Sequence, residues 1–556
     1  MSFQDVLQKK KAGIAGYFSD ETNRYRFCTL LLFILIITAL AWQSDDAYHA
    51  YVMAKNLVLG NGFVYNVGER VSATSCPLFT LVIAGGYFVI RKMFIVSLLT
   101  CIIFSALAYF IVMKNFCKTK KQVIITFLAL IGSSCFISYT TSGLENCLLF
   151  FLAALFMKYY FHSGTYNGRQ LFVLAVLVAL IAMTRMDAVL MFVPMVVFAF
   201  LARREKVSFL RAVGIGLAGL LPFIGWELFS LIYYGFPVPN TAYVKLGTDI
   251  PLKEYLVRGV QYLLTSAVCD VLLIAVPVVV VLVTLIIKKA AYLYCSAGMV
   301  LYAGYVLYIG GDFMLGRHFT VLFFLSVICC LQMQNREVGT YQGKLKLERI
   351  VVGTVIAGLI YSGTTGVITT QFLFGNNFSS PISDERAGYF RFTSLFNNAL
   401  SYLREGQLVL RDAWNEQGID EYRNAGYRGG ILKMVPGISI YYNSDMYLND
   451  LYALGDPFLS KLPAVREENW RIGHMWRESP AGYNDTVLYG ENVIENEDLY
   501  QYYEIIKLIT RGEIWDKERL RAIIDINTGK YDNLIENYKN TLDENCMQQI
   551  NGQEEK

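Results

Sequence analysis

The sequence predicts a polytopic α-helical membrane protein that carries a soluble α+β domain at its C-terminal end. Hydrophobic residues make up 55% of its 556 residues, and the mean hydropathy is +0.40. Charged residues make up only 17%, against about 25% in ordinary globular domains. The apolar residues also come in runs that approach the roughly 20 residues needed to cross a bilayer. Because one water-soluble core cannot hold so much apolar surface, most of it must face lipid.

Run length predicts about eleven membrane-spanning segments. They are expected at Phe27–Trp42, Met93–Met113, Gln122–Tyr139, Glu145–Phe161, Leu171–Thr184, Ala188–Leu201, Leu210–Tyr233, Val268–Ile287, Ala291–Ile309, Phe319–Met333 and Ile350–Gln371. Pro77–Ile90 is apolar but short, and we expect it to lie on the membrane surface or dip into it.

Positive charge orients the segments, because loops rich in Lys and Arg stay in the cytoplasm. With eleven spans, every basic loop and the basic N-terminus fall on one side, and the tail falls on the other. The N-terminus is therefore expected to be cytoplasmic, followed by an uncleaved signal anchor. We predict a membrane domain over 1–371, with a first outer loop over 44–92 that carries juxtamembrane helices, and an extracytoplasmic domain over 372–556. The net charge of +4 is small and indicates no nucleic-acid partner.

The tail combines two kinds of pattern. Short strand-like runs such as Ile438–Tyr442 lie between turn residues, and helical patterns follow near Leu499–Ile509 and Lys517–Ile526. These patterns predict the α+β class of the domain.

The first outer loop opens on an acidic pair, Asp45-Asp46. Apolar residues at helical spacing then predict an amphipathic helix on the membrane surface that ends at Gly60. Adjacent residues on a helix diverge by about 100°, so the two carboxylates should not point the same way. One can face a cavity while the other caps a helix or binds a cation. Simple capping of the following helix is the structural alternative for both.

An ordered set of motifs continues from this pair. It comprises Asp45–Tyr48, Ala54–Val58, Gly60–Gly62, Val64–Val71, Thr184–Asp187, Tyr233–Gly235, Pro239–Thr241, Tyr243–Lys245, Gly310–Met314, Gly316-Arg317, Trp470–His474 and Pro480–Tyr483. The set resembles the GT-C superfamily of glycosyltransferases, and within it the terminal arabinofuranosyltransferases of mycobacterial cell walls. Val67, Met186 and the run Ser72–Cys76 depart from the family pattern, which leaves the sugar and the acceptor open.

The resemblance implies a GT-C fold and an inverting membrane glycosyltransferase of cell wall biogenesis. Such an enzyme moves a sugar, arabinofuranose in the mycobacterial relatives, from a polyprenyl-phosphate donor to a cell-envelope glycan or lipid-linked acceptor. The reaction takes place on the outer face of the bacterial cytoplasmic (inner) membrane. Asp45 is the expected general base. Asp46 is expected to be its partner or, with Asp45, a ligand of a divalent cation, the one cofactor considered.

Cations near the outer ends of the spans are expected to bind the departing lipid phosphate, because its charge needs stabilisation. They are Arg185, Lys245, Arg317 and His318. Anchoring at the membrane interface is the structural alternative for them. Substrate contacts are expected from Asn240, Tyr243, Asp312 and His474, with helix capping as the alternative for Asp312.

Other ionisable residues receive no role in the chemistry. Asp187 is expected to pair with Arg185, and neither Asp187 nor Glu145 is predicted to be catalytic. His49 and His162 show no ligand-like spacing and are assigned no metal.

Two other classes of function are alternatives to a glycosyltransferase. A lipid-linked sugar or polysaccharide transporter or flippase is the main alternative, and it would need polar groups at bilayer depth and often repeated halves. The predicted spans are nearly free of charge, and no inverted repeat is seen. A scaffold that binds polysaccharide is the third possibility, and it would have no need of an acidic pair at the membrane mouth.

Overall fold

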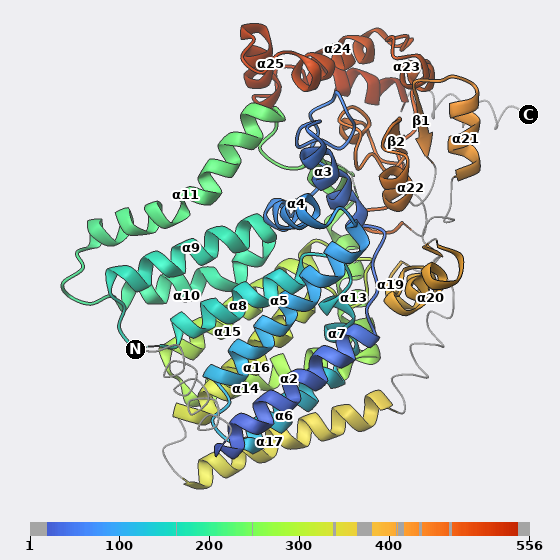
Figure 1. Ribbon diagram of the computed structural model, residues 1–556. Coiled ribbons are helices and arrows are strands. Elements are labelled where there is room, and N and C mark those ends of the chain that lie inside the picture. The colour runs from blue at the N-terminus through green and yellow to red at the C-terminus, as the bar shows by residue number, and fades with distance from the viewer. Residues whose placement is uncertain are drawn as a thin grey trace, which may run out of the picture. The chain divides into compact units, whose positions relative to one another are not determined.

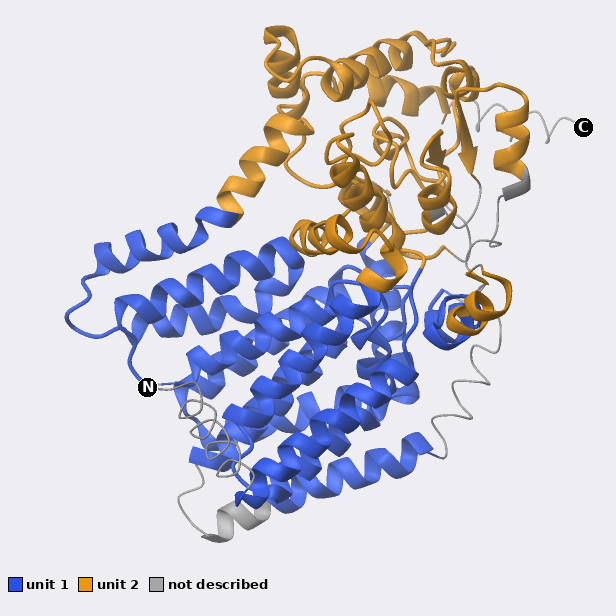
Figure 2. Cartoon of the chain, in the orientation of Figure 1, with its two compact units in different colours: residues 1–44, 97–222, 252–397 blue, residues 45–96, 223–251, 398–556 orange. Residues whose placement is uncertain are grey.

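The computed structural model describes the chain apart from residues 1–18, 163, 247, 249, 337–340, 364–380, 407, 410–415, 433–435, 466–469 and 543–556. The described part is mostly helical, with two short strands (Figure 1). It divides into two compact units, which Figure 2 distinguishes by colour. Unit 1 contains 1–44, 97–222 and 252–397, and unit 2 contains 45–96, 223–251 and 398–556.

Unit 1 is a helical bundle. Its elements are α2 (Glu21–Ala39), most of α5 (Met93–Asn115), α6 (Lys120–Gly132), α7 (Ser134–Thr140), α8 (Asn146–Tyr160), α9 (Gly168–Thr184), η1 (Met186–Ala188), α10 (Val189–Leu201), the first part of α11 (Phe209–Tyr233), α13 (Leu252–Cys269), α14 (Val271–Ile287), α15 (Ala290–Tyr308), α16 (Phe319–Arg336), α17 (Tyr341–Tyr361), α19 (Glu385–Thr393) and the start of α20 (Leu395–Glu405). Helix α16 packs against α8 and α14, and α10 packs against α15. The buried face of α16 is almost continuous, which places it at the centre of this bundle.

Five described helices are long and apolar enough to cross a membrane: α2, α5, α11, α15 and α16. Two bent pairs, α6 with α7 and α13 with α14, raise the number to seven when each pair counts as one span. The structure therefore agrees with a polytopic membrane protein but does not confirm eleven spans. Helices α8, α9 and α10 have 13 to 17 residues, short of the roughly 20 that a span needs. The last expected span, Ile350–Gln371, lies partly outside the described residues.

The two bent pairs break at polar residues. Ser133 caps the N-terminus of α7 after a bend of 83°, and Asp270 caps α14 after a bend of 106°. The Asp270 carboxylate also accepts hydrogen bonds from Ser133 Oγ at 2.7 Å and from the backbone N–H of Cys135 at 2.9 Å. One buried carboxylate thus joins both breaks and satisfies helix-terminal donors that would otherwise lie buried without acceptors.

Unit 2 joins the first outer loop and the segment 223–251 to the tail. Its elements are α3 (Ala47–Leu59), α4 (Pro77–Ile90), the end of α11, α12 (Asn240–Leu246), most of α20, α21 (Glu416–Asn424), β1 (Gly429–Leu432), α22 (Pro436–Tyr442), β2 (Tyr447–Asp450), η4 (Leu459–Lys461), α23 (Tyr483–Tyr489), α24 (Glu497–Arg511) and α25 (Lys517–Asn527). Strands β1 and β2 pair in parallel, with Gly429 opposite Tyr447. This division differs from the expected boundary between 371 and 372, because chain order does not decide which loops pack on the tail.

Several local predictions can be compared with unit 2. Helix α3 has the expected position, and Gly60 ends it with a left-handed φ of 85°, a conformation that glycine adopts without strain. The helix is buried on most of its length, so it is not the surface helix expected. Helices α24 and α25 match the two predicted helical patterns. Ile438–Tyr442, expected as a strand, lies in α22.

Candidate functional site

The residues predicted to act in catalysis or binding form two groups, one in each unit. Unit 1 holds Arg185, Asp312, Arg317 and His318, and unit 2 holds Asp45, Asp46, Asn240, Tyr243, Lys245 and His474.

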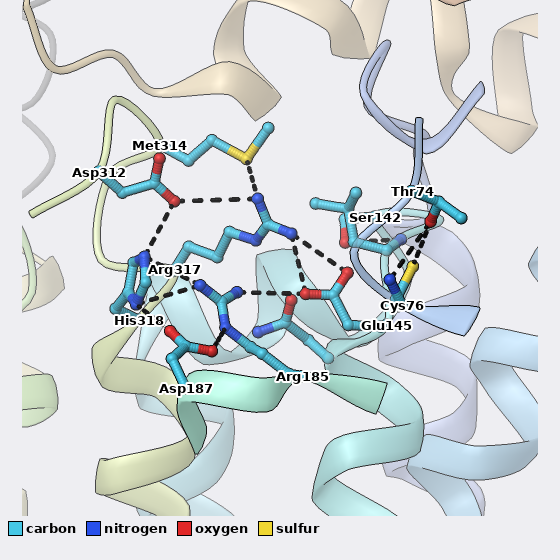
Figure 3. Close-up of polar contacts among 12 residues, drawn as sticks. Thr74, Cys76, Ser142, Glu145, Arg185, Asp187, Asp312, Met314, Arg317 and His318 are labelled. Carbon is cyan, nitrogen blue, oxygen red and sulfur yellow. Dashed lines mark hydrogen bonds and ion pairs between the residues drawn. The ribbon is translucent and has the colours of Figure 1, made fainter. Parts of the chain in front are cut away.

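The unit 1 residues meet in a network of ion pairs (Figure 3). Glu145 lies between two guanidinium groups, 3.1 Å from Arg185 Nη1 and 2.9 Å from Arg317 Nη2. Arg185 Nε also contacts Asp187 at 2.9 Å, which confirms the predicted pair. The Nε2 atom of His318 lies 2.9 Å from Nη2 of Arg185. The structure therefore brings Arg185, Arg317 and His318 together, around a glutamate for which no role in the chemistry was predicted.

Asp312 completes this network through a glycine-rich turn. Its carboxylate lies 3.5 Å from His318 Nε2 and 3.8 Å from Arg317 Nη1. Gly310 and Gly311 precede it with φ values of 82° and 81°, a region that favours glycine. A Cβ on Gly311 would lie 2.4 Å from the Cβ of Tyr262. The turn therefore needs glycine for its backbone and for its packing, and this explains the residue types that precede Asp312.

Arg185 enters the network because helix α9 ends just before it. Its backbone is extended, and the short helix η1 then turns the chain into α10. Tyr302, from α15, contacts His318 Nδ1 at 3.0 Å through its hydroxyl. The sequence showed no signal for Tyr302, because it lies within an apolar helix where tyrosines are common.

The electrostatic balance of this network is close to neutral. Two guanidinium groups and three carboxylates leave a formal charge of −1 when His318 is neutral. Burial of the Glu145 carboxyl would raise its pKa, but Arg317 and Arg185 together hold that pKa below its ordinary value. Glu145 is therefore ionised and fixes the planes of both guanidinium groups, which presents them in a defined orientation.

The acidic pair of unit 2 has two distinct environments. Asp45 is 4% exposed, and its Oδ1 and Oδ2 accept from the backbone N–H groups of Ile438 at 2.8 Å and Gly437 at 3.2 Å. Asp46 is the N-cap residue of α3, yet its side chain makes no capping hydrogen bond. Simple capping of the following helix therefore accounts for neither carboxylate, although Asp45 does bind the first turn of α22.

Burial raises the pKa of Asp45 to about 7, the two backbone N–H groups oppose this rise, and the charge of Asp46 adds to it. A carboxyl with a pKa near neutrality is suited to general-base work, because it can both take up and release a proton at physiological pH.

His49 lies beside this pair, a proximity that its spacing in the sequence did not indicate. Ligand atoms of Asp45, Asp46 and His49 all lie within 4.8 Å of one another. The Tyr65 hydroxyl contacts His49 Nδ1 at 2.6 Å, while Nε2 is buried without a hydrogen-bond partner among the described residues. Burial lowers the pKa of His49, so the imidazole is neutral and can donate a lone pair. Two carboxylates and an imidazole fit a divalent transition-metal ion such as Mn²⁺.

The other unit 2 candidates have separate surroundings. The side-chain amide of Asn240 donates to the carbonyl oxygens of Ala453, Leu454 and Asp456 and accepts from Ser460 Oγ. These bonds use both N–H groups of the amide and one lone pair of its oxygen, so the geometry favours a structural role for Asn240.

The ring of Tyr243 lies beneath Lys461 Nζ, which is 2.6 Å from the ring centroid. Lys245 is exposed at the end of α12. The ring of His474 packs edge-on against Tyr452, and burial lowers the pKa of His474 to about 3. His474 is therefore neutral, and neighbouring Arg471, Lys245 and His49 lower its pKa further.

Comparison with known proteins gives one informative similarity. No family model matches the chain, and no solved structure matches it. The chain is 28% identical over 221 residues to the terminal β-(1→2)-arabinofuranosyltransferase of Mycobacterium tuberculosis. The match covers 37% of this chain and 35% of the relative's length. Together with the apolar helices, this similarity supports a membrane glycosyltransferase in general.

Proposed function

We propose that the protein is an inverting membrane glycosyltransferase that uses a polyprenyl-phosphate sugar and extends a cell-envelope glycan on the outer face of the cytoplasmic membrane. The observation that carries the proposal is the buried Asp45 carboxylate, placed beside Asp46 and His49 in a loop whose motifs resemble those of GT-C enzymes. The similarity to the mycobacterial arabinofuranosyltransferase supports the reaction class. Arabinofuranose is the first sugar to test, since that relative's name contains it.

In the proposed reaction, an acceptor hydroxyl attacks the anomeric carbon while the bond from that carbon to the phosphate oxygen breaks. The configuration inverts, and the hydroxyl proton passes to Asp45. Each oxygen of the Asp45 carboxylate accepts one backbone N–H bond and has a second lone pair for this proton. Asp46 and His49 would hold a divalent cation together with Asp45, and such a cation would neutralise phosphate charge.

The leaving lipid phosphate needs no proton, but its charge needs stabilisation. We assign this task to Arg185 and Arg317, whose guanidinium groups are fixed by Glu145, and to His318. Lys245 of unit 2 stays a prediction from the sequence, as a point charge for phosphate.

The substitution Asp45→Asn tests the general base. We expect transfer from a polyprenyl-phosphate sugar to fall by about 10²–10⁴-fold, the usual contribution of general-base catalysis, while expression and membrane insertion persist. The assay is transfer of labelled sugar by the purified full-length protein from a panel of polyprenyl-phosphate pentoses and hexoses. Asp485→Asn is the matched control, because Asp485 is exposed on α23. Full transfer by the Asp45→Asn variant would overturn the assignment.

The proposed orientation has an independent test. A single cysteine introduced as Glu491→Cys, an exposed position in the tail, should react with a membrane-impermeant maleimide added to intact cells. Cys546 is replaced by serine in this background, so that the introduced thiol is the one in the tail. Labelling that requires cell lysis would place the tail in the cytoplasm and contradict the proposed topology.

A further inference from the structure

A polar cavity lies at one end of the unit 1 bundle, far from the ion-pair network. It has a volume of about 650 Å³ and lies where α5, α8 and α16 end and α6 begins. Helix α16 starts directly after His318 and ends at Arg336, which lines the cavity. Its 18 residues span about 27 Å at 1.5 Å per residue, close to the roughly 30 Å hydrocarbon thickness of a bilayer. The cavity and the network therefore lie near opposite ends of α16.

The rim of the cavity is positively charged. Lys118, Lys158 and Arg336 line it with exposed side chains. Glu348 is the one carboxylate among the described lining residues, and it already forms an ion pair with Lys121. Such a rim attracts an anion, and Lys and Arg near a membrane surface each contribute about 1 kcal/mol to the attraction of anionic lipid.

The floor of the cavity offers amide groups. Gln332 is 6% exposed, and its Nε2 is buried without an acceptor among the described residues. A buried donor without a partner is costly, so this atom indicates that an acceptor from a ligand completes the site. Phosphate oxygens and glycerol hydroxyls both supply such an acceptor.

A narrow apolar groove continues from the polar cavity. The two share Gln122, Gln334 and Glu348 in their linings. Beyond these residues the groove runs between α6, α14, α16 and α17, lined by apolar side chains that include Ala129, Val280, Leu331 and Val355. A polar pocket that opens into an apolar groove fits a molecule with an anionic head and a hydrocarbon chain.

We propose that this cavity and groove bind an anionic glycerophospholipid, with its phosphate at the Lys118, Lys158 and Arg336 rim and one acyl chain in the groove. A soluble phosphate compound shares the head-group chemistry but has no chain to fill the groove. In the proposed topology the site faces the cytoplasmic leaflet, where anionic lipids are abundant. The site does not rest on the proposed sugar transfer.

The test measures lipid binding to the purified full-length protein by native mass spectrometry and by competition in detergent. We expect dioleoyl phosphatidylglycerol to bind at least tenfold more tightly than dioleoyl phosphatidylcholine. Lys118→Gln with Lys158→Gln should weaken this binding by about 25-fold, or about fivefold for each cation removed. The control Arg204→Gln with Lys288→Gln removes two exposed charges elsewhere on unit 1 and should change binding less than threefold.

Two further arms separate the possible sources of the phosphate. Gln332→Met should weaken phosphatidylglycerol binding about tenfold without lowering thermal stability, because the buried donor has no partner to lose. Dihexanoyl phosphatidylglycerol and glycerol 3-phosphate should compete poorly. Competition by glycerol 3-phosphate as strong as that of the long-chain lipid would overturn the lipid assignment. If the two double variants weakened phosphatidylglycerol binding equally, the binding would depend on general surface charge. That result would also overturn the proposed site.

Discussion

The substitution Glu145→Gln should strongly destabilise unit 1. Glu145 is 3% exposed and is the carboxylate shared by Arg185 and Arg317, at 3.1 and 2.9 Å. At about 3 Å and an effective dielectric constant of about 20, each pair contributes about 5 kcal/mol of Coulomb energy before desolvation. Measured losses on breaking a buried pair are about 3–5 kcal/mol. Because two pairs break at once, we expect at least about 3 kcal/mol of lost stability.

The assay is chemical unfolding of the purified protein in detergent, followed by tryptophan fluorescence at pH 7 and at lower pH. The control is Glu205→Gln, since Glu205 is exposed in the loop after α10 and should shift stability by less than about 0.5 kcal/mol. The folded pKa of Glu145 is depressed, so its stabilisation is present above the unfolded pKa of about 4.3 and is lost as pH falls through the folded value. The Glu145→Gln variant should lack this part of the unfolding free energy, which the wild type loses at low pH. A loss under 1 kcal/mol with wild-type pH dependence would refute the reasoning.

Three other predictions follow from single contacts. Asp270→Ala should cost about 3 kcal/mol or more in the same unfolding assay, because it leaves several buried donors without an acceptor; stability within 1 kcal/mol of the wild type would contradict the bridging role. Gly311→Ala should be destabilising because of its φ of 81° and the close Tyr262 side chain, whereas Gly304→Ala, at an open helical position, should be neutral or slightly stabilising. Mn²⁺ should raise the thermal stability of the wild type but not of His49→Ala, and an equal rise in both would exclude His49 as a ligand.

Local sequence rules located the elements that depend on nearby residues. Helix α3 has the expected limits because its apolar spacing and Gly60 define it locally, and Arg185 pairs with Asp187 two residues away. The proximity of His49 to the acidic pair was missed, because Asp45 lies in the turn before α3 and His49 lies within that helix. The breaks at Ser133 and Asp270 were also missed inside apolar runs, although both are favoured N-cap residues.

Contacts between residues that lie far apart along the chain could not be predicted from the sequence. Glu145 is 40 residues from Arg185 and 172 residues from Arg317, and nothing local marks it as their shared partner. Run length predicted eleven spans, of which the described residues support five to seven by length and composition, since a run does not show whether a helix bends or stays short. Unit 2 combines the outer loop with the tail. This combination also results from tertiary packing, which the local sequence does not show.

The two N–H groups that hold Asp45 come from positions 392 and 393 residues later in the chain. At a synthesis rate of about 5–20 residues per second, the ribosome makes these donors roughly 20–80 seconds after Asp45. The surroundings of the proposed base are therefore assembled only after the chain has been made as far as Ile438. A nascent chain that has inserted its first helices has the acidic pair but not its hydrogen-bond partners, so activity should not begin before Ile438 has been made.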